Sequence, residues 1–208
     1  MILEQIKVGS MQVNCYILGD SQTRRAIIID PGDEYERIKR FLAQKNLKAA
    51  FIINTHGHMD HIGSDDKFGL KVYAHKDEVS MLKDANENLS GFLLAPLTVN
   101  SEVYPLEDNQ DIRLDSIHLR VMHTPGHTPG GISLLLMYPK NKIVFTGDTL
   151  FCQGIGRTDF PGASEALIIK SIKSRLFTLS NDTLVYPGHG PSTTIGAEKK
   201  GNPFIDYP

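Results

Sequence analysis

The sequence predicts an α+β domain in which helices cover mixed β-sheet. Short runs of β-type residues open the chain, and apolar residues at helical spacing follow them. Neither an internal repeat nor a Pro/Ser-rich linker divides the 208 residues. We therefore expect a single domain, residues 1–208, that is long enough to bury a sizeable core.

The first three β-type runs lie at residues 3–8, 13–18 and 26–29. Turn residues stand between or after them, at Asp20-Ser21 and at Asp30-Pro31-Gly32. We expect these runs to form consecutive antiparallel strands.

Helical and strand patterns are mixed in the rest of the chain. Residues 34–45 carry apolar side chains at helical spacing, and residues 50–53 follow as a buried strand. Further helices are predicted at residues 76–82 and 163–175. Further strands are predicted at residues 71–74, 117–122, 131–137, 142–145 and 183–186.

Composition disfavours several classes of protein. The net charge is −2 and like charges form no block, so we expect no nucleic-acid partner and no polybasic membrane anchor. The longest apolar run, around residues 132–138, is far shorter than the ~20 residues of a spanning helix. Glu4 and Lys7 interrupt any signal-peptide pattern, and Cys15 and Cys152 show no close pairing. We expect a cytoplasmic protein with two free thiols.

Three of the eight histidines are concentrated directly after the apolar residues 51–53. They are His56, His58 and His61, and Asp60 stands among them. Because side chains repeat every two residues in extended chain, His56 and His58 project to the same side, while Asp60 and His61 turn toward the next helix. This pattern predicts two ligand pairs, one for each of two adjacent metal ions.

Three more potential ligands follow other predicted strands. They are His127, Asp148 and His189, and a glycine precedes each of them. If the strand ends meet at one edge, that edge gathers five histidines and two aspartates from separate segments. The glycines suit a crowded site, because a glycine lets the backbone approach closely. A lone histidine is more often structural, and we interpret His75, His118 and His123 in that way.

Imidazole and carboxylate ligands without thiolate suit zinc, iron or manganese. Zinc is the leading expectation, with iron or manganese as alternatives. The first ion would take His56, His58 and His127, the second Asp60, His61 and His189, and Asp148 would bridge both. Two divalent cations carry four positive charges, and two aspartates with one hydroxide carry three negative charges. The centre is therefore net positive, which favours an anionic substrate or a developing oxyanion.

The motif His-x-His-x-Asp-His at residues 56–61, followed by His127, Asp148 and His189, resembles the metallo-β-lactamase superfamily over essentially the whole chain. The resemblance implies a four-layer αββα sandwich with a dinuclear site at one edge of two sheets. Residues 14–16, 156–160, 187–191 and 193–196 are similar to short glyoxalase II-like (hydroxyacylglutathione hydrolase-like) enzymes. Those enzymes cleave thioesters such as S-lactoylglutathione. Full-length glyoxalase II has a C-terminal helical region that contacts glutathione, whereas only residues 190–208 follow His189 here, so the carrier thiol is left open.

Other activities within the superfamily remain open alternatives. Residues 156–160 also resemble persulfide dioxygenases, which would hold one iron with His56, His127 and Asp148. Hydrolysis of another ester or a lactone is also open. True β-lactamase activity is less favoured, because Asp148 is not part of the lactamase pattern. A tRNase-like role is disfavoured by the missing basic surplus, and a closed structural zinc site by the missing thiolates.

We expect metal-assisted hydrolysis, in which a bridging hydroxide attacks the substrate carbonyl. Asp60 would act both as ligand and as the catalytic group that orients the hydroxide. Residues 84–109 are long for a connection and contain apolar residues, so Phe92 and Leu93 would either border the active-site mouth or pack as a satellite core.

Two further substrate contacts are expected in the glycine-rich segment after Asp148. Arg157 would either pair with a substrate carboxylate or hold its loop through Asp159, and Phe160 stands beside it. The expected partner is a small-molecule thioester, expected to be anionic. The residues predict no oligomeric state.

Overall fold

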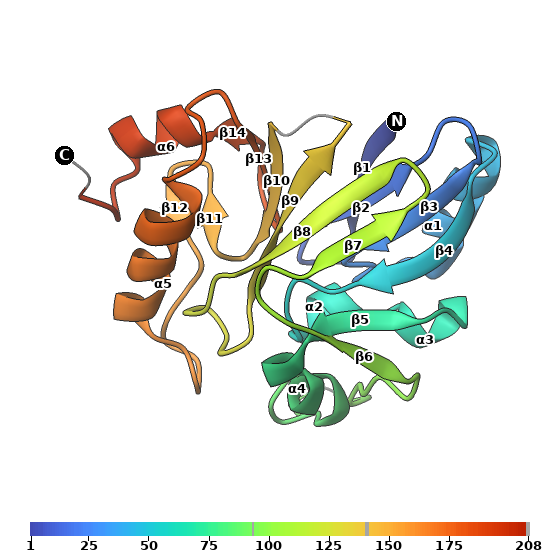
Figure 1. Cartoon of the computed structure of the whole chain (residues 1–208). Helices are drawn as coiled ribbons and strands as arrows, with labels where there is room; N and C mark the ends of the chain where they lie inside the picture. The colour runs from blue at the N-terminus through green and yellow to red at the C-terminus, as the bar shows by residue number, and fades with distance from the viewer. Residues whose placement is uncertain (93, 140–141, 207–208) are drawn as a thin grey trace.

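A computed structural model describes residues 1–92, 94–139 and 142–206. Two six-stranded mixed sheets pack face to face, and helices cover the outer face of each sheet (Figure 1). The predicted α+β class and the four-layer αββα arrangement are confirmed.

The first sheet begins with the antiparallel strands β1 (Ile2–Val8), β2 (Val13–Gly19) and β3 (Arg25–Ile29), as predicted. It continues in parallel register, where each strand needs a crossover. These later strands are β4 (Lys48–Ile53), β5 (Val72–His75) and β6 (Val103–Leu106). The crossovers contain α1 (Tyr35–Gln44), α2 (Met59–Ile62), α3 (Asp65–Phe68), the 3-10 turn Lys76–Glu78 and α4 (Val79–Lys83).

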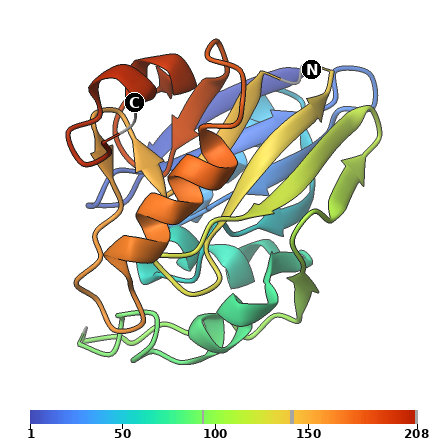
Figure 2. The same cartoon turned by 60° about the vertical axis from the view of Figure 1, so that its left-hand side comes forward.

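The second sheet has the order β14-β13-β10-β9-β8-β7, and only β10 and β13 pair in parallel. Helix α5 (Glu165–Ser171) continues into a π-helical turn, Ile172–Leu176, and crosses the outer face of this sheet (Figure 2). Helix α6 (Ile195–Gly201) covers the same side, and β11 (Leu150–Phe151) and β12 (Gly154–Ile155) form a small hairpin. The strands are β7 (Asp111–Leu114), β8 (Ile117–His123), β9 (Ile132–Tyr138), β10 (Ile143–Gly147), β13 (Leu184–Pro187) and β14 (Thr193–Thr194).

Three apolar clusters correspond to the three spaces between the four layers. The middle cluster joins side chains of both sheets, among them Ile27 and Phe145. One outer cluster packs the first sheet against α1 through Ile38, and the other packs the second sheet against α5 through Ile168. Apolar burial on both faces of each sheet explains why the strands read as nearly continuous apolar runs.

Several predicted boundaries differ from the structure. Residues 84–109 are not a single connection, because β6 pairs with β5 at their C-terminal end. The helix expected at residues 76–82 is divided between a 3-10 turn and α4. Strand β6 has only four residues and contains Pro105, and β7 also has only four, so neither had a clear strand pattern.

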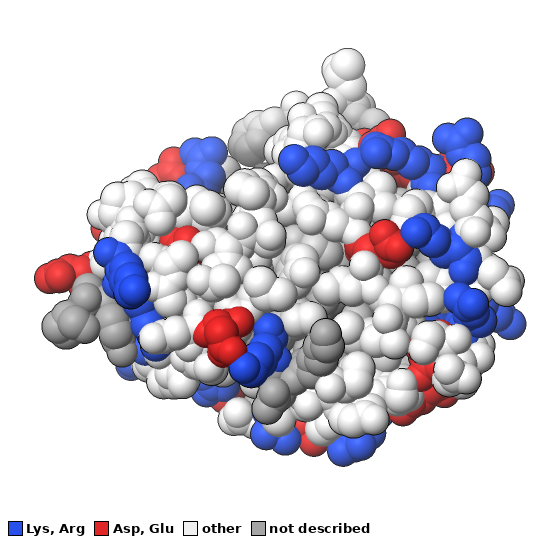
Figure 3. Space-filling model, turned by 90° about the horizontal axis from the view of Figure 1, so that it is seen from above, with Lys and Arg blue, Asp and Glu red and all other residues white. Residues whose placement is uncertain are grey.

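The surface carries both signs of charge. Figure 3 shows one face on which Lys and Arg side chains lie mainly toward the periphery, several of them side by side along one edge, with acidic groups near them and mostly neutral surface in the middle. Among the described residues, no helix is long and apolar enough to cross a membrane.

We predict that Phe145→Ala lowers the free energy of unfolding by about 3–5 kcal/mol. Phe145 is fully buried between the sheets, with its ring centroid 5.1 Å from that of Tyr16. Denaturant titration measures the loss. The control Phe204→Ala removes an aromatic side chain that is 57% exposed, and it should change stability by less than about 0.5 kcal/mol. Equal effects of the two variants would contradict the assignment of Phe145 to the central core.

Candidate metal centre

The predicted ligands lie beyond the C-terminal ends of four strands that meet at one edge of the sandwich. Four of them, His56, His58, Asp60 and His61, follow β4 of the first sheet. The loops after β8, β10 and β13 of the second sheet carry the others, which are His127, Asp148 and His189. Two sheets packed face to face bring these loops together, although they span more than half of the chain.

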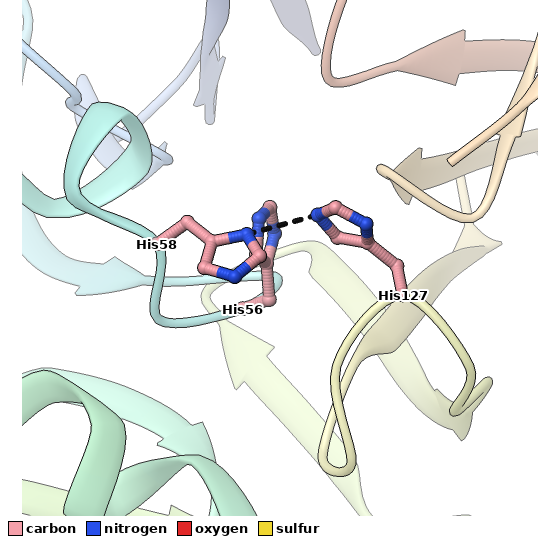
Figure 4. Close-up of side chains that lie close together, drawn as sticks. All are labelled: His56, His58 and His127. Carbon is pink, nitrogen blue, oxygen red and sulfur yellow. Dashed lines mark hydrogen bonds between the residues drawn. The ribbon is translucent and has the colours of Figure 1, made fainter. Parts of the chain in front are cut away.

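The first cluster consists of His56, His58 and His127, whose potential ligand atoms all lie within 4.8 Å of one another. Figure 4 shows His58 and His127 pointing at each other from loops of different sheets, with His58 Nδ1 2.9 Å from His127 Nε2. All three side chains are buried. Burial, together with the neighbouring His127 and His61 rings, lowers the pKa of His58 to about 3. Burial likewise lowers the pKa of His56, so the His56 and His58 rings are neutral and can offer lone pairs to a cation.

The second cluster consists of Asp60, His61 and His189. His189 Nε2 lies 3.3 Å from Asp60 Oδ2, and His61 Nε2 lies 3.9 Å from the same oxygen. Burial lowers the pKa of His61, but nearby carboxylates outweigh it and hold that pKa well above its usual range. The second cluster is thus the more negative of the two, because it contains a carboxylate and the first does not.

Asp148 lies between the two clusters. Its Oδ1 is 3.4 Å from His61 Nε2, and its Oδ2 is 3.7 Å from His127 Nε2 and 3.6 Å from His189 Nε2. Burial raises the pKa of this carboxyl, but the surrounding imidazoles outweigh burial and hold it well below its usual range. One ionised carboxylate therefore faces ligands of both clusters, as expected for a bridging residue.

Polar contacts on the outer side of three of the rings restrict their orientation. His61 Nδ1 lies 3.0 Å from Asp30 Oδ2, and His127 Nδ1 donates to the carbonyl of Arg157 at 2.8 Å. His189 Nδ1 donates to the carbonyl of Met11 at 3.1 Å. With Nδ1 facing an oxygen on the outer side, Nε2 of each of these rings is directed at the centre of the site.

Sequence reasoning missed Asp30, which it interpreted as a turn residue. Asp30 directly follows β3, as Asp148 follows β10, and this shared position was the available signal. Its carboxylate accepts the backbone N–H and the hydroxyl of Thr55, both at 2.7 Å, while it faces His61. Asp30 thus connects the end of β3 to the ligand loop after β4.

Glu78 was also missed. This fully buried carboxylate accepts the backbone N–H of Gly57 and that of Gly130, both at 2.7 Å. Gly57 lies between His56 and His58, and Gly130 lies in the loop of His127. Burial raises the pKa of Glu78 to about 7, while its hydrogen bonds oppose the rise. Glu78 therefore joins the two loops of the first cluster, one from each sheet.

The glycine before His189 lies where a side chain has no room. A Cβ on Gly188 would stand 2.1 Å from Asp148 Oδ1 and 2.8 Å from His61 Cε1. On the other side, the loop is held by Asn14, whose side chain donates to the carbonyls of Pro187 and Gly190 at 2.9 and 3.0 Å. The backbone at Gly188 therefore approaches the ligands as closely as the sequence pattern implied.

A cavity of about 900 Å³ opens onto both clusters. The predicted substrate contacts Phe92, Arg157 and Phe160 line it, while Leu93 lies outside the described residues. Arg157 forms a two-pronged ion pair with Asp159, at 2.7 and 2.6 Å, and its guanidinium stacks on Phe160 at 3.9 Å. Of the two roles considered for Arg157, this geometry shows the pairing with Asp159.

The remaining histidines stand apart from these clusters. His118 lies 3.1 Å from Asp111, and His75 stacks on His123 with ring centroids 4.1 Å apart. The potential ligand atoms of His75, Asp77 and His123 also lie within 4.8 Å of one another, which is the spacing of a possible metal site. The parallel stacking of the two rings, 10° apart, is unlike the convergence of ring edges on one point in the main clusters.

The chain belongs to the metallo-β-lactamase superfamily, whose family model matches residues 8–189. It is 38% identical over 209 residues to the probable metallo-hydrolase YqgX of Bacillus subtilis, covering 97% of this chain and 96% of that one. It is 35% identical over 212 residues to the hydroxyacylglutathione hydrolase GloC of Haemophilus influenzae, covering 99% of each. The resemblance stated from the sequence is confirmed.

Solved structures agree with this assignment. The crystal structure of the BLEG-1 B3 metallo-β-lactamase has a TM-score of 0.90 at 38% identity, over 98% of this chain and 99% of that one. TTHA1623 in a di-iron-bound form has a TM-score of 0.83 at 34% identity, over 97% and 100%. ETHE1 from Myxococcus xanthus has a TM-score of 0.78 at 31% identity, over 98% and 84%.

We predict that Gly188→Ala lowers stability by about 1–3 kcal/mol and reduces bound metal, because the added methyl displaces Asp148. Elemental analysis of the purified protein measures the metal. The matched control is Gly154→Ala in β12, where a Cβ would make an ordinary contact of 3.6 Å with Phe151. Metal content equal to that of the control would contradict the tight approach at Gly188.

We predict that Asp30→Asn weakens metal affinity by about 10- to 100-fold, because the amide removes the negative charge that faces His61 Nδ1 at 3.0 Å. Competition with a chromophoric chelator measures the affinity. Asp20→Asn provides the control, since Asp20 is also a buried carboxylate but binds the backbone of Gln22, Thr23 and Ser116 instead. Loss of affinity in both variants would indicate a general effect on folding.

Proposed function

We propose that the protein is a dinuclear metal-dependent hydrolase, similar to glyoxalase II, that cleaves thioesters such as S-lactoylglutathione. The observation that carries the proposal is the pair of ligand clusters that share Asp148 and face one cavity. The similarity to GloC, named a hydroxyacylglutathione hydrolase, supports the choice of thioesters.

The residues present fit two divalent ions. His56 Nε2 is buried and has no hydrogen-bond partner among the described residues, which is costly unless a cation occupies the site. His56, His58 and His127 would hold one ion, Asp60, His61 and His189 the other, and Asp148 both. The donors are nitrogen and oxygen only, which fits zinc and also iron or manganese. Zinc is our proposal for the ions.

In the overall reaction, water adds to the thioester carbonyl, a carbon–oxygen bond forms, the carbon–sulfur bond breaks and the thiol leaves with a proton. When bound, the ions supply Lewis-acid polarisation of the carbonyl and acidification of water. The carboxylate of Asp60 borders the cavity and can accept a hydrogen bond from the attacking water. His189, at 3.3 Å, fixes the position of that carboxylate.

A second candidate is a persulfide dioxygenase with one iron. The similarity to ETHE1 favours it, and His56, His127 and Asp148 would provide the two-histidine, one-carboxylate ligand set. Elemental analysis and oxygen uptake separate the two candidates. One iron per chain, with oxygen consumed on glutathione persulfide and no thioester cleaved, would replace our proposal. A β-lactam belongs in the same assay panel because of the similarity to BLEG-1.

We predict that Asp60→Asn lowers kcat for thioester hydrolysis by about 100-fold or more, because the amide is a weaker ligand and a poorer proton acceptor. Thiol release detected with a chromogenic disulfide measures the rate, and elemental analysis measures the metal. The control Asp111→Asn changes a carboxylate that also faces a histidine, His118, but lies away from the cavity. Near-normal turnover in Asp60→Asn would exclude the proposed role.

A further inference from the structure

The side chains that line the cavity indicate which thioesters the site would accept. We propose that the preferred substrates are thioesters that carry an apolar, uncharged group on the acyl or thiol side, in place of a multiply charged thiol such as glutathione. The inference rests on the proposed thioester hydrolysis and concerns which thioesters the same site accepts.

Apolar side chains form most of the cavity around the ligands. They come from three separate parts of the chain, so the lining is a feature of the assembled site and of no single loop. The main members are Met59, Leu89, Phe92, Phe151, Ile155 and Phe160. Contact between these side chains and an apolar part of a ligand stabilises the complex. The same side chains provide no hydrogen bond and no opposite charge to a carboxylate.

Two aromatic rings stand directly beside the ligands. Phe160 lies edge-on to His58, with ring centroids 5.5 Å apart, and Phe151 lies edge-on to His189 at 6.2 Å. Each metal cluster therefore has an aromatic neighbour on the cavity side. Groups attached to either side of a reacting carbonyl would contact one of these rings within a few atoms of the centre.

Charge compensation for an anionic thiol is lacking among the described residues that line the cavity. Arg157 is the one Lys or Arg side chain there, and both its Nε and an Nη are bonded to Asp159. The pair carries no net charge, and the face of the guanidinium is covered by Phe160. The carboxylates of glutathione would lose water in this cavity without gaining a free cationic partner.

The rim of the cavity is also apolar. Phe92 is 92% exposed and Met11 is 44% exposed, and both line the cavity. Large apolar side chains left in water at the mouth of a site are typical of a surface that a ligand covers. Because Phe92 has little packing of its own, its removal leaves the fold intact and isolates its contribution to binding.

The experiment uses metal-loaded protein and two series of thioesters. In the first series the thiol is neutral N-acetylcysteamine and the acyl group is acetyl, butanoyl or hexanoyl. In the second the acyl group is acetyl and the thiol is N-acetylcysteamine, benzyl mercaptan or glutathione. We expect kcat/KM to rise by up to about fourfold per methylene in the first series. In the second we expect benzyl mercaptan to exceed glutathione by more than about tenfold.

The variant Phe92→Ala should reduce the hexanoyl-to-acetyl ratio of kcat/KM by about three- to tenfold, because the longer acyl group loses more apolar contact than the acetyl group does. Phe204→Ala, which removes an exposed aromatic side chain outside the cavity, should leave the ratio as it is. A flat acyl series, or a preference for the glutathione thioester, would overturn this inference while the thioester hydrolase proposal stands. Absence of cleavage with every thioester would instead reject the proposed function itself.

Discussion

The two nitrogens of an imidazole ring point in different directions, so the partner of one nitrogen determines where the other nitrogen points. This constraint governs the centre. The Nδ1 atoms of His61, His127 and His189 each have an oxygen partner on the outer side, from Asp30 and from two backbone carbonyls. Their Nε2 atoms are therefore directed inward. The positions of these three oxygens, on Asp30, Arg157 and Met11, therefore determine how the three rings lie.

Those oxygens belong to different layers, and polar contacts hold the two sheets together where the ligands meet. Glu78 joins the loop of His56 and His58 to the loop of His127 through two backbone N–H groups. For the second cluster, β2 of the first sheet contacts the His189 loop, because Tyr16 and Asn14 both donate to the carbonyl of Pro187, at 2.7 and 2.9 Å. Between these points the inner faces of the two sheets pack through apolar side chains. The apolar core thus sets the distance between the sheets, and these polar contacts set the positions of the loops.

The sequence predicted the residues of the two clusters better than the groups that contact them from outside. His56, His58, Asp60 and His61 stand too densely after an apolar strand to be core, and the glycines before the other ligands mark crowding. Glu78 has no such local signal. Its partners lie 21 and 52 residues away, so only the folded chain shows that its carboxylate faces two backbone N–H groups.

The same distinction explains which elements were predicted. Strands such as β2 and β10 are buried at every position and carry a strong pattern. Short β6 pairs at a sheet edge, and α2 has only four residues, two of which are candidate ligands. Elements of this kind exist because neighbouring parts of the fold position them, and propensity alone does not identify them.

The apolar walls and the polar centre depend on each other. Charged and dipolar groups interact more strongly where apolar side chains exclude water, so Phe151 and Phe160 strengthen every interaction among the ligands beside them. The same exclusion raises the cost of any charge that enters without a partner. Asp159 removes the one cation that the described lining offers, so the cavity presents a polar centre within an apolar funnel. If the site cleaves thioesters as we propose, this arrangement would stabilise charge that develops at the reacting carbonyl and disfavour charge carried elsewhere on the substrate.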